Sequence, residues 1–302
     1  MRTTMRPVLL FALKAVIGAA LLWFVIARIP LGEALTAAVS LDPGVVALAA
    51  ALYFLAHAVN AVKLKVFLPD LSLWQSWRFT MIGVLYGVAL PGQLAGDAVK
   101  AVRLARMQRG GDIGAILAAV AVDKIVGIFA LLVLVALVIG IDATAFDRTV
   151  VAATVLALGG AIAVLAGAIL LPVPAWLGRF GPSLAAWRRA SMQPGRLSYA
   201  LVLGLVFQAL CVAITGLVGA RLGIELSIAA WTVVVGFSSI VLLAPVSIAG
   251  IGVREATLVG AIGYLGGNEA GAFALSLVLL GLTVIGAIAG LIVDLAGRDR
   301  IN

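Results

Sequence analysis

Long apolar stretches alternate with short charged segments along most of this chain. A helix needs about 20 apolar residues to cross a hydrocarbon core of about 30 Å. Six stretches meet this requirement, and we expect each to be a full transmembrane helix: Pro7–Ala27, Pro43–Val62, Ile113–Gly140, Thr149–Gly178, Leu197–Ala220 and Ala270–Val293. The pattern therefore predicts an all-α, polytopic membrane protein.

Two further apolar regions are interrupted by proline: Trp77–Gly96 contains Pro91, and Leu226–Gly266 contains Pro245. Because cytoplasmic loops are enriched in Lys and Arg, the loop charges indicate how each region runs. A full crossing by 77–96 would place the cations at 100–109 outside. We therefore expect two broken hairpins that enter from opposite faces, with both chain termini in the cytoplasm. Whether 226–266 is a re-entrant hairpin or two full spans is left open.

Composition supports the membrane class. Of the 302 residues, 64% are hydrophobic and 11% are charged, and the mean hydropathy is +1.23, whereas soluble domains carry about 25% charged residues. The net charge of +8 does not indicate nucleic acid, because Lys and Arg lie between apolar runs. We expect a single integral membrane domain, 1–302, with membrane lipids as partners. The lone cysteine, Cys211, excludes an intramolecular disulfide.

The two interrupted regions share a motif. PGQLAGDAVK at 91–100 and PVSIAGIGVR at 245–254 both fit P-x-x-[LI]-A-G-x-x-V-[KR], with an offset of 154. The repeat motifs extend over 90–106 and 244–260, and three predicted spans separate them. An inverted repeat with discontinuous helices is how many transporters build a substrate site. The predicted helix-break and backbone residues are Pro91, Gly92, Gly96, Pro245, Gly250 and Gly252.

Ionisable residues lie inside or beside the apolar segments, where each costs about 2.5–3.5 kcal/mol to insert. The candidate substrate and translocation residues are Asp97, Lys100, Arg103, Asp123, Lys124, Arg254 and Glu255. We expect the cations to meet anionic ligand groups, and the carboxylates to hold those cations or bind a cationic head group. Asp97 and Lys100 are one helical turn apart and can pair. A structural network of buried charges is the alternative reading, and both can hold.

Other polar and small residues have simpler interpretations. Lys63 follows the span Pro43–Val62 and is assigned to a cytoplasmic loop. Gln208 is expected to hydrogen-bond between helices, and the GxxxG motifs at 83–87 and 286–290 are typical of packing faces. The chain contains no GxxxxGK[ST], HExxH or GxSxG motif, so we expect no nucleotide, metal, other cofactor or catalytic activity.

Three segments resemble one known family, the lysylphosphatidylglycerol synthase transmembrane-region family. LPGQLAGDAVKAVRLAR (90–106) resembles its P-G-G-L-G-G-D-x-x-R signature, although Lys100 stands where arginine is usual and Gln93 and Ala95 replace glycines. AVDKIVG (121–127) resembles its acidic-basic pair, and GIGVREATLVGAIGYLG (250–266) resembles its G-x-G-x-R-E-A segment. The resemblance implies a flippase-like membrane domain without the soluble aminoacyl-transferase domain of the full synthases.

These observations predict a lipid flippase-like transporter of the bacterial cytoplasmic (inner) membrane, and not an enzyme. The lipid would be anionic, aminoacylated, polyprenyl or hopanoid, and the sequence does not choose between these classes. The alternative is a non-transporting membrane partner that presents a lipid to a separate synthase or glycosyltransferase. The oligomeric state is left open.

Overall fold

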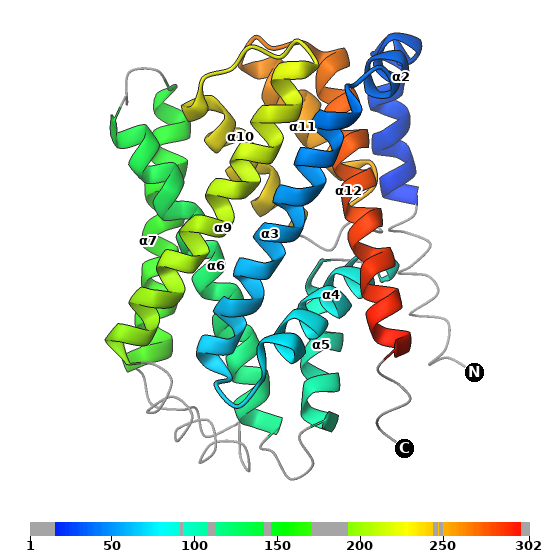
Figure 1. The fold of residues 1–302 in the computed structure, drawn as a ribbon. Coiled ribbons are helices and arrows are strands. Elements are labelled where there is room, and N and C mark those ends of the chain that lie inside the picture. Colours follow the sequence, from blue (N-terminus) through cyan, green and yellow to red (C-terminus); the bar gives the residue numbers. More distant parts are fainter. Residues whose placement is uncertain are drawn as a thin grey trace, which may run out of the picture. The chain divides into compact units, whose positions relative to one another are not determined.

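The computed structural model describes residues 16–90, 93–107, 113–141, 146–170, 193–243, 247 and 250–296. Within these ranges the chain forms helices and no strand, which confirms the predicted all-α class (Figure 1). A helix at Val16–Ile26 comes first. The labelled helices are α2 (Leu31–Val39), α3 (Pro43–Phe67), α4 (Leu73–Ala89), α5 (Gln93–Met107), α6 (Ile113–Ile141), α7 (Arg148–Leu170), α9 (Pro194–Arg221), α10 (Ile228–Leu243), α11 (Val253–Tyr264) and α12 (Glu269–Ala296).

Four of the six predicted spans are confirmed as helices long and apolar enough to cross a membrane: α3, α6, α9 and α12. The helix at Val16–Ile26 and α2 pass the same test together, and they are bent by 95° at their junction. Helices suit this setting because each satisfies its backbone hydrogen bonds internally, without water. The start of the first predicted span and the end of the fourth lie outside the described residues. Orientation in the membrane stays a prediction.

Both proline-interrupted regions form pairs of shorter helices. α4 ends at Ala89 and α5 begins at Gln93, whereas α10 ends at Leu243 and α11 begins at Val253. Proline lacks a backbone N–H and disfavours helical geometry in the residue before it, so a helix tends to end ahead of it. Pro91, Gly92 and Pro245 themselves lie outside the described residues.

Helix boundaries follow the 154-residue offset of the two motifs. α3 and α9 end at Phe67 and Arg221, and α4 and α10 end at Ala89 and Leu243, so both pairs of ends are 154 positions apart. The starts and ends of α6 and α12 agree with the same offset to within two residues. The order of four helices, α3 to α6, thus recurs in α9 to α12. The inverted orientation of the two copies stays a prediction.

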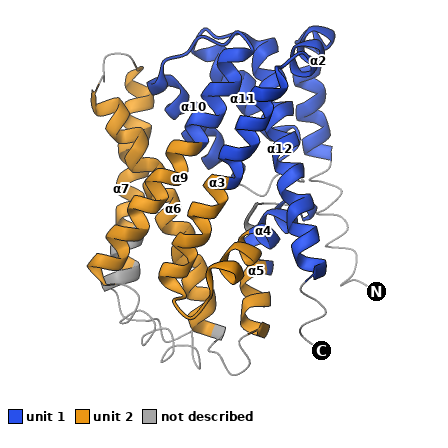
Figure 2. Ribbon diagram, in the orientation of Figure 1, with its two compact units in different colours: residues 1–54, 81–99, 211–297 blue, residues 55–80, 100–210, 298–302 orange. Residues whose placement is uncertain are grey.

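The chain divides into two compact units, coloured separately in Figure 2. Unit 1 contains residues 1–54, 81–99 and 211–297, and unit 2 contains residues 55–80, 100–210 and 298–302. Each unit is built from segments far apart in the sequence, because α3, α4, α5 and α9 contribute one part to each. The single integral domain expected for 1–302 stays a prediction.

Glycines allow close packing between helices in unit 1. A Cβ at Gly96 of α5 would overlap the carbonyl oxygen of Gly83 and lie 2.7 Å from the amide nitrogen of Gly87 in α4. A Cβ at Gly286 of α12 would lie 2.6 Å from the hydroxyl of Tyr53 in α3. Both GxxxG segments therefore lie at packing contacts, as predicted.

Candidate functional site

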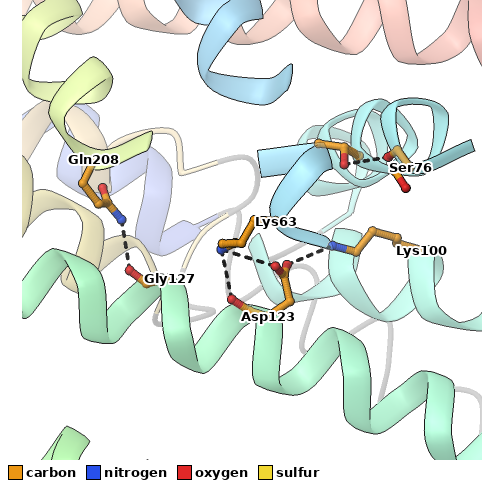
Figure 3. A network of polar contacts seen from close by, with 7 residues as sticks. Lys63, Ser76, Lys100, Asp123, Gly127 and Gln208 are labelled. Atoms are coloured by element: carbon orange, nitrogen blue, oxygen red, sulfur yellow. Dashed lines mark hydrogen bonds and ion pairs between the residues drawn. The ribbon is translucent and has the colours of Figure 1, made fainter. Parts of the chain in front are cut away.

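Three ionisable side chains from three helices of unit 2 meet in its interior (Figure 3). Asp123 belongs to α6, Lys63 to the last two turns of α3, and Lys100 to α5. Their exposed fractions are 4%, 3% and 3%. Because burying an ion away from water is costly, such groups persist where they neutralise one another or serve a ligand.

One carboxylate lies between the two ammonium groups. The Nζ atom of Lys63 is 3.4 Å from Oδ1 of Asp123, and the Nζ atom of Lys100 is 3.9 Å from Oδ2 (Figure 3). Lys63 also donates a hydrogen bond of 3.0 Å to the backbone carbonyl of Asp123. Asp123 therefore links α3 and α5 to α6, and the three side chains sum to one positive charge when all are ionised.

Two glycines make room for Lys63. Gly127 lies one helical turn after Asp123, and a Cβ placed there would be 3.0 Å from the Lys63 Nζ atom. A Cβ at Gly204 of α9 would be 2.8 Å from the Ala130 side chain and 4.0 Å from Cδ of Lys63. The missing side chains let the lysine stem pass close to α6 and α9.

Further polar groups of unit 2 lie on α9 and α4. Gln208 donates a hydrogen bond of 3.2 Å from Nε2 to the backbone carbonyl of Gly127 in α6, which confirms its predicted bond between helices. On α4, the Thr80 hydroxyl donates to the carbonyl of Ser76 at 2.8 Å. The Ser76 side chain is fully buried, and its hydroxyl has no hydrogen-bond partner within the described part of the chain. A buried hydroxyl in this state is uncommon in proteins.

The predicted residues that lie close to Lys100 and Asp123 in the sequence are more exposed. Lys124 follows Asp123 on α6 and is half-buried, as is Arg103, one turn beyond Lys100 on α5. Asp97 is also half-buried and belongs to the part of α5 assigned to unit 1. The predicted pairing of Asp97 with Lys100 stays a prediction.

Arg254 and Glu255 lie in unit 1, in the first turn of α11. Both are buried, with exposed fractions of 7% and 2%. The backbone N–H of Gly252 donates a hydrogen bond of 2.6 Å to Oε2 of Glu255, and the Ser276 hydroxyl of α12 lies 3.5 Å from Oε1. A carboxylate at this position satisfies a backbone donor at the helix start and complements the helix dipole. Glu255 thus stabilises the beginning of α11.

The glycines before α11 adopt backbone conformations that other residues avoid. Gly250 and Gly252 have φ angles of +77° and +80°. A Cβ at Gly252 would overlap the carbonyl oxygen of Gly18 in the helix at Val16–Ile26. Only glycine satisfies both conditions, because it has no Cβ and tolerates positive φ.

Lys63 was predicted to lie in a loop, and this prediction is wrong. α3 continues past Val62 to Phe67, so Lys63 lies inside the helix and the loop begins only at Leu68. A signal was present in the chain: Ala49 and Ala56 precede Lys63 at intervals of seven, and all three are at most 3% exposed. Residues seven apart lie on nearly the same helix face, so Lys63 continues the buried face of α3.

The long helices and the buried ionic cluster define a multi-pass membrane protein with charged side chains held inside it. Among the described residues, no three His, Cys, Asp or Glu side chains are grouped so as to hold a metal ion. The family model described as lysylphosphatidylglycerol synthase TM region matches residues 11–290. The chain belongs to this family, as its three signature segments indicated, and the family has a membrane lipid-related role. Comparison with curated proteins gave no match.

Proposed function

We propose that the protein is a flippase-like transporter for a lipid with an anionic head group, and that Lys100 contacts this group. The observation that carries the proposal is the burial of Lys63, Lys100 and Asp123 together, each at most 4% exposed. Two ammonium groups lie beside one carboxylate there, and buried cations of this kind can serve an anionic ligand. Membership of a lipid-related membrane family supports a lipid as the source of that anion.

The chemistry of the cluster suits a head group that carries phosphate. A lysine ammonium binds phosphate as a compact charge with three donors. In this low-dielectric interior the attraction is stronger than in water. The head group would be sheltered by the polar side chains while the acyl chains remain among membrane lipids. Arg103 and Lys124 are half-buried and lie close in sequence to Lys100 and Asp123. They would add positive charge along the route that the head group takes through the protein.

We propose a ligand-binding role for Arg254 and a structural role for Glu255. Arg254 would meet the same anionic group at another stage of its passage. Glu255 would keep the first turn of α11 in place, since its carboxylate accepts the hydrogen bond from the Gly252 N–H. We expect no enzymatic step in this protein.

Transport by the purified protein alone is the direct test. Vesicles of phosphatidylcholine would contain the protein and a trace of fluorescently labelled phosphatidylglycerol, and a membrane-impermeant quencher would report movement between leaflets. We expect transport by the wild-type protein and a rate at least tenfold slower for Lys100→Met, because a lost charged contact costs about 1.5–3 kcal/mol and about 1.4 kcal/mol is a factor of ten in rate. Gly140→Ala is the matched control, since a Cβ at Gly140 in α6 meets nothing within 4 Å.

The outcomes separate the two candidate roles. Transport that depends on Lys100 supports the flippase role. A folded wild-type protein that binds the lipid but moves none would exclude it, and would favour a partner that presents lipid to a separate synthase or glycosyltransferase.

A further inference from the structure

One carboxylate oxygen of the buried cluster accepts no hydrogen bond. Oδ1 of Asp123 is shielded from water and has no hydrogen-bond partner within the described part of the chain. The Lys63 ammonium lies 3.4 Å from Oδ1, yet the hydrogen bond that it donates goes to the backbone carbonyl of Asp123, at 3.0 Å. An ionised carboxylate has several acceptor positions, and a buried acceptor without a donor is costly. This oxygen can therefore accept a further hydrogen bond.

The hydroxyl of Ser76 on α4 also lacks a hydrogen-bond partner among the described residues of unit 2 (Figure 3). The two cases differ in their chemistry. A hydroxyl carries its own hydrogen and can turn toward an acceptor, whereas an ionised carboxylate depends on a donor that another group brings. Asp123 also lies in a charged cluster formed by α3, α5 and α6. Asp123 is therefore the stronger candidate for a contact with a ligand.

The position of Lys63 determines which kind of donor suits Oδ1. A donor at the usual hydrogen-bond distance from Oδ1 would lie within about 6 Å of the Lys63 Nζ atom, which is itself 3.4 Å from this oxygen. Two ammonium groups at such a distance repel each other strongly in a low-dielectric interior. A hydroxyl group donates a hydrogen bond without adding charge. Oδ1 therefore favours an uncharged donor over the ammonium of a cationic head group.

We infer that Asp123 accepts a hydrogen bond from a hydroxyl group of the lipid head group. It would thereby select phosphodiester lipids whose head group carries a free hydroxyl, as glycerol and sugars do. This inference rests on the proposed function and adds a specificity-determining residue to it. The hydroxyl contact involves Oδ1 and leaves the contact between Oδ2 and Lys100 in place. Because Oδ1 is shielded in this conformation, the groups around it must separate when the hydroxyl enters.

Two short-chain lipids that differ only in their hydroxyl groups test this inference on the purified full-length protein. Dioctanoyl phosphatidylglycerol and dioctanoyl phosphatidylpropanol carry the same charge, and both are titrated in a neutral detergent. We expect the wild type to bind phosphatidylglycerol about tenfold or more tightly, a usual result of one hydrogen bond to a charged group. In Asp123→Asn the acceptor is neutral, so this preference should fall to a few-fold. Gly140→Ala on α6 is the matched control and should keep the preference, since a Cβ there meets nothing within 4 Å.

The ratio of the two affinities separates a ligand contact from a structural role of Asp123. A loss of fold stability, or a shift of the neighbouring lysines, would weaken the binding of both lipids alike and leave the ratio unchanged. Asp123→Ala removes the acceptor altogether, and the two lipids should then bind equally. Should Asp123→Ala not fold, Asp123→Asn carries the test, because it preserves the size of the side chain.

The outcomes keep this inference distinct from the proposed function. Equal binding of the two lipids by the wild type would overturn the inference, since Oδ1 would then be satisfied by water and not by the ligand. A full preference for phosphatidylglycerol in Asp123→Asn would also overturn it, because the hydroxyls would be recognised elsewhere. Lys100→Met should weaken the binding of both lipids about equally and keep their ratio. If Lys100→Met changes neither affinity, the phosphate contact of the proposed function is wrong, and the ratio still decides the hydroxyl contact.

Discussion

Lys100 in unit 2 and Arg254 in unit 1 occupy matching positions of the two motifs, 154 residues apart. Each unit also contains a buried carboxylate, Asp123 in unit 2 and Glu255 in unit 1, and these two carboxylates bind different kinds of partner. In unit 2, Asp123 contacts lysine side chains that come from two other helices. In unit 1, Glu255 accepts a hydrogen bond from the backbone N–H of Gly252, three residues before it. One carboxylate holds side chains, and the other holds the start of its own helix.

The contacts of Asp123 with lysine side chains can be exchanged for contacts with a ligand, whereas the contact of Glu255 with a backbone N–H is fixed. A side-chain ammonium group can turn from a carboxylate to a phosphate by rotating its stem, at a modest cost in entropy. A backbone N–H at a helix start cannot move without unwinding that helix. We therefore expect the lysine contacts of Asp123 to exchange with an anionic ligand, and the contact of Glu255 to stabilise the fold.

The largest effect is expected for Asp123→Ala. The substitution leaves Lys63 and Lys100 buried without the carboxylate they share. Removing one partner of a buried ionic pair costs about 3–5 kcal/mol. Thermal unfolding in detergent should show a clear drop in the melting temperature. A melting temperature close to that of the wild type would contradict the cluster geometry.

An intermediate effect is expected for Gly252→Ala. The new Cβ would overlap the Gly18 carbonyl, and the residue would keep a φ of +80°. A strained backbone of this kind costs about 1–3 kcal/mol. Gly266→Ala is the matched control, because it has a φ of +79° and open space around its Cβ. If both variants lose the same stability in thermal unfolding, backbone strain alone is responsible and the contact with Gly18 contributes nothing.

The smallest effect is expected for Glu255→Gln. Glutamine keeps an oxygen that accepts from the Gly252 N–H and loses the charge that favours the helix start. Capping interactions of this type contribute about 0.5–2 kcal/mol. Lipid binding should be preserved, and the melting temperature should fall less than in Asp123→Ala. A loss as large as that of Asp123→Ala would mean that Glu255 also neutralises a buried cation, and the contrast between the units would disappear.

Much of the fold was predictable from local patterns. Uncharged runs of sufficient length predicted α9 and α12 to within about three residues at either end, because apolar length and helix formation go together in a membrane. The short motifs around Pro91 and Pro245 predicted where α4 and α10 would end. The candidate site was predictable in part: Asp123 and Lys100 were chosen because charges inside apolar sequence are costly.

By itself, the sequence determined the helices, their interruptions and the family, since these depend on hydrophobic length, proline and short motifs read in chain order. Only the tertiary structure decided that Asp123 lies between Lys63 and Lys100, and that Glu255 binds the backbone of Gly252. Helix rotation and close packing at Gly127 bring together residues 60 positions apart in the chain. That pairing has no local signature, because it depends on which face each helix turns toward its neighbours.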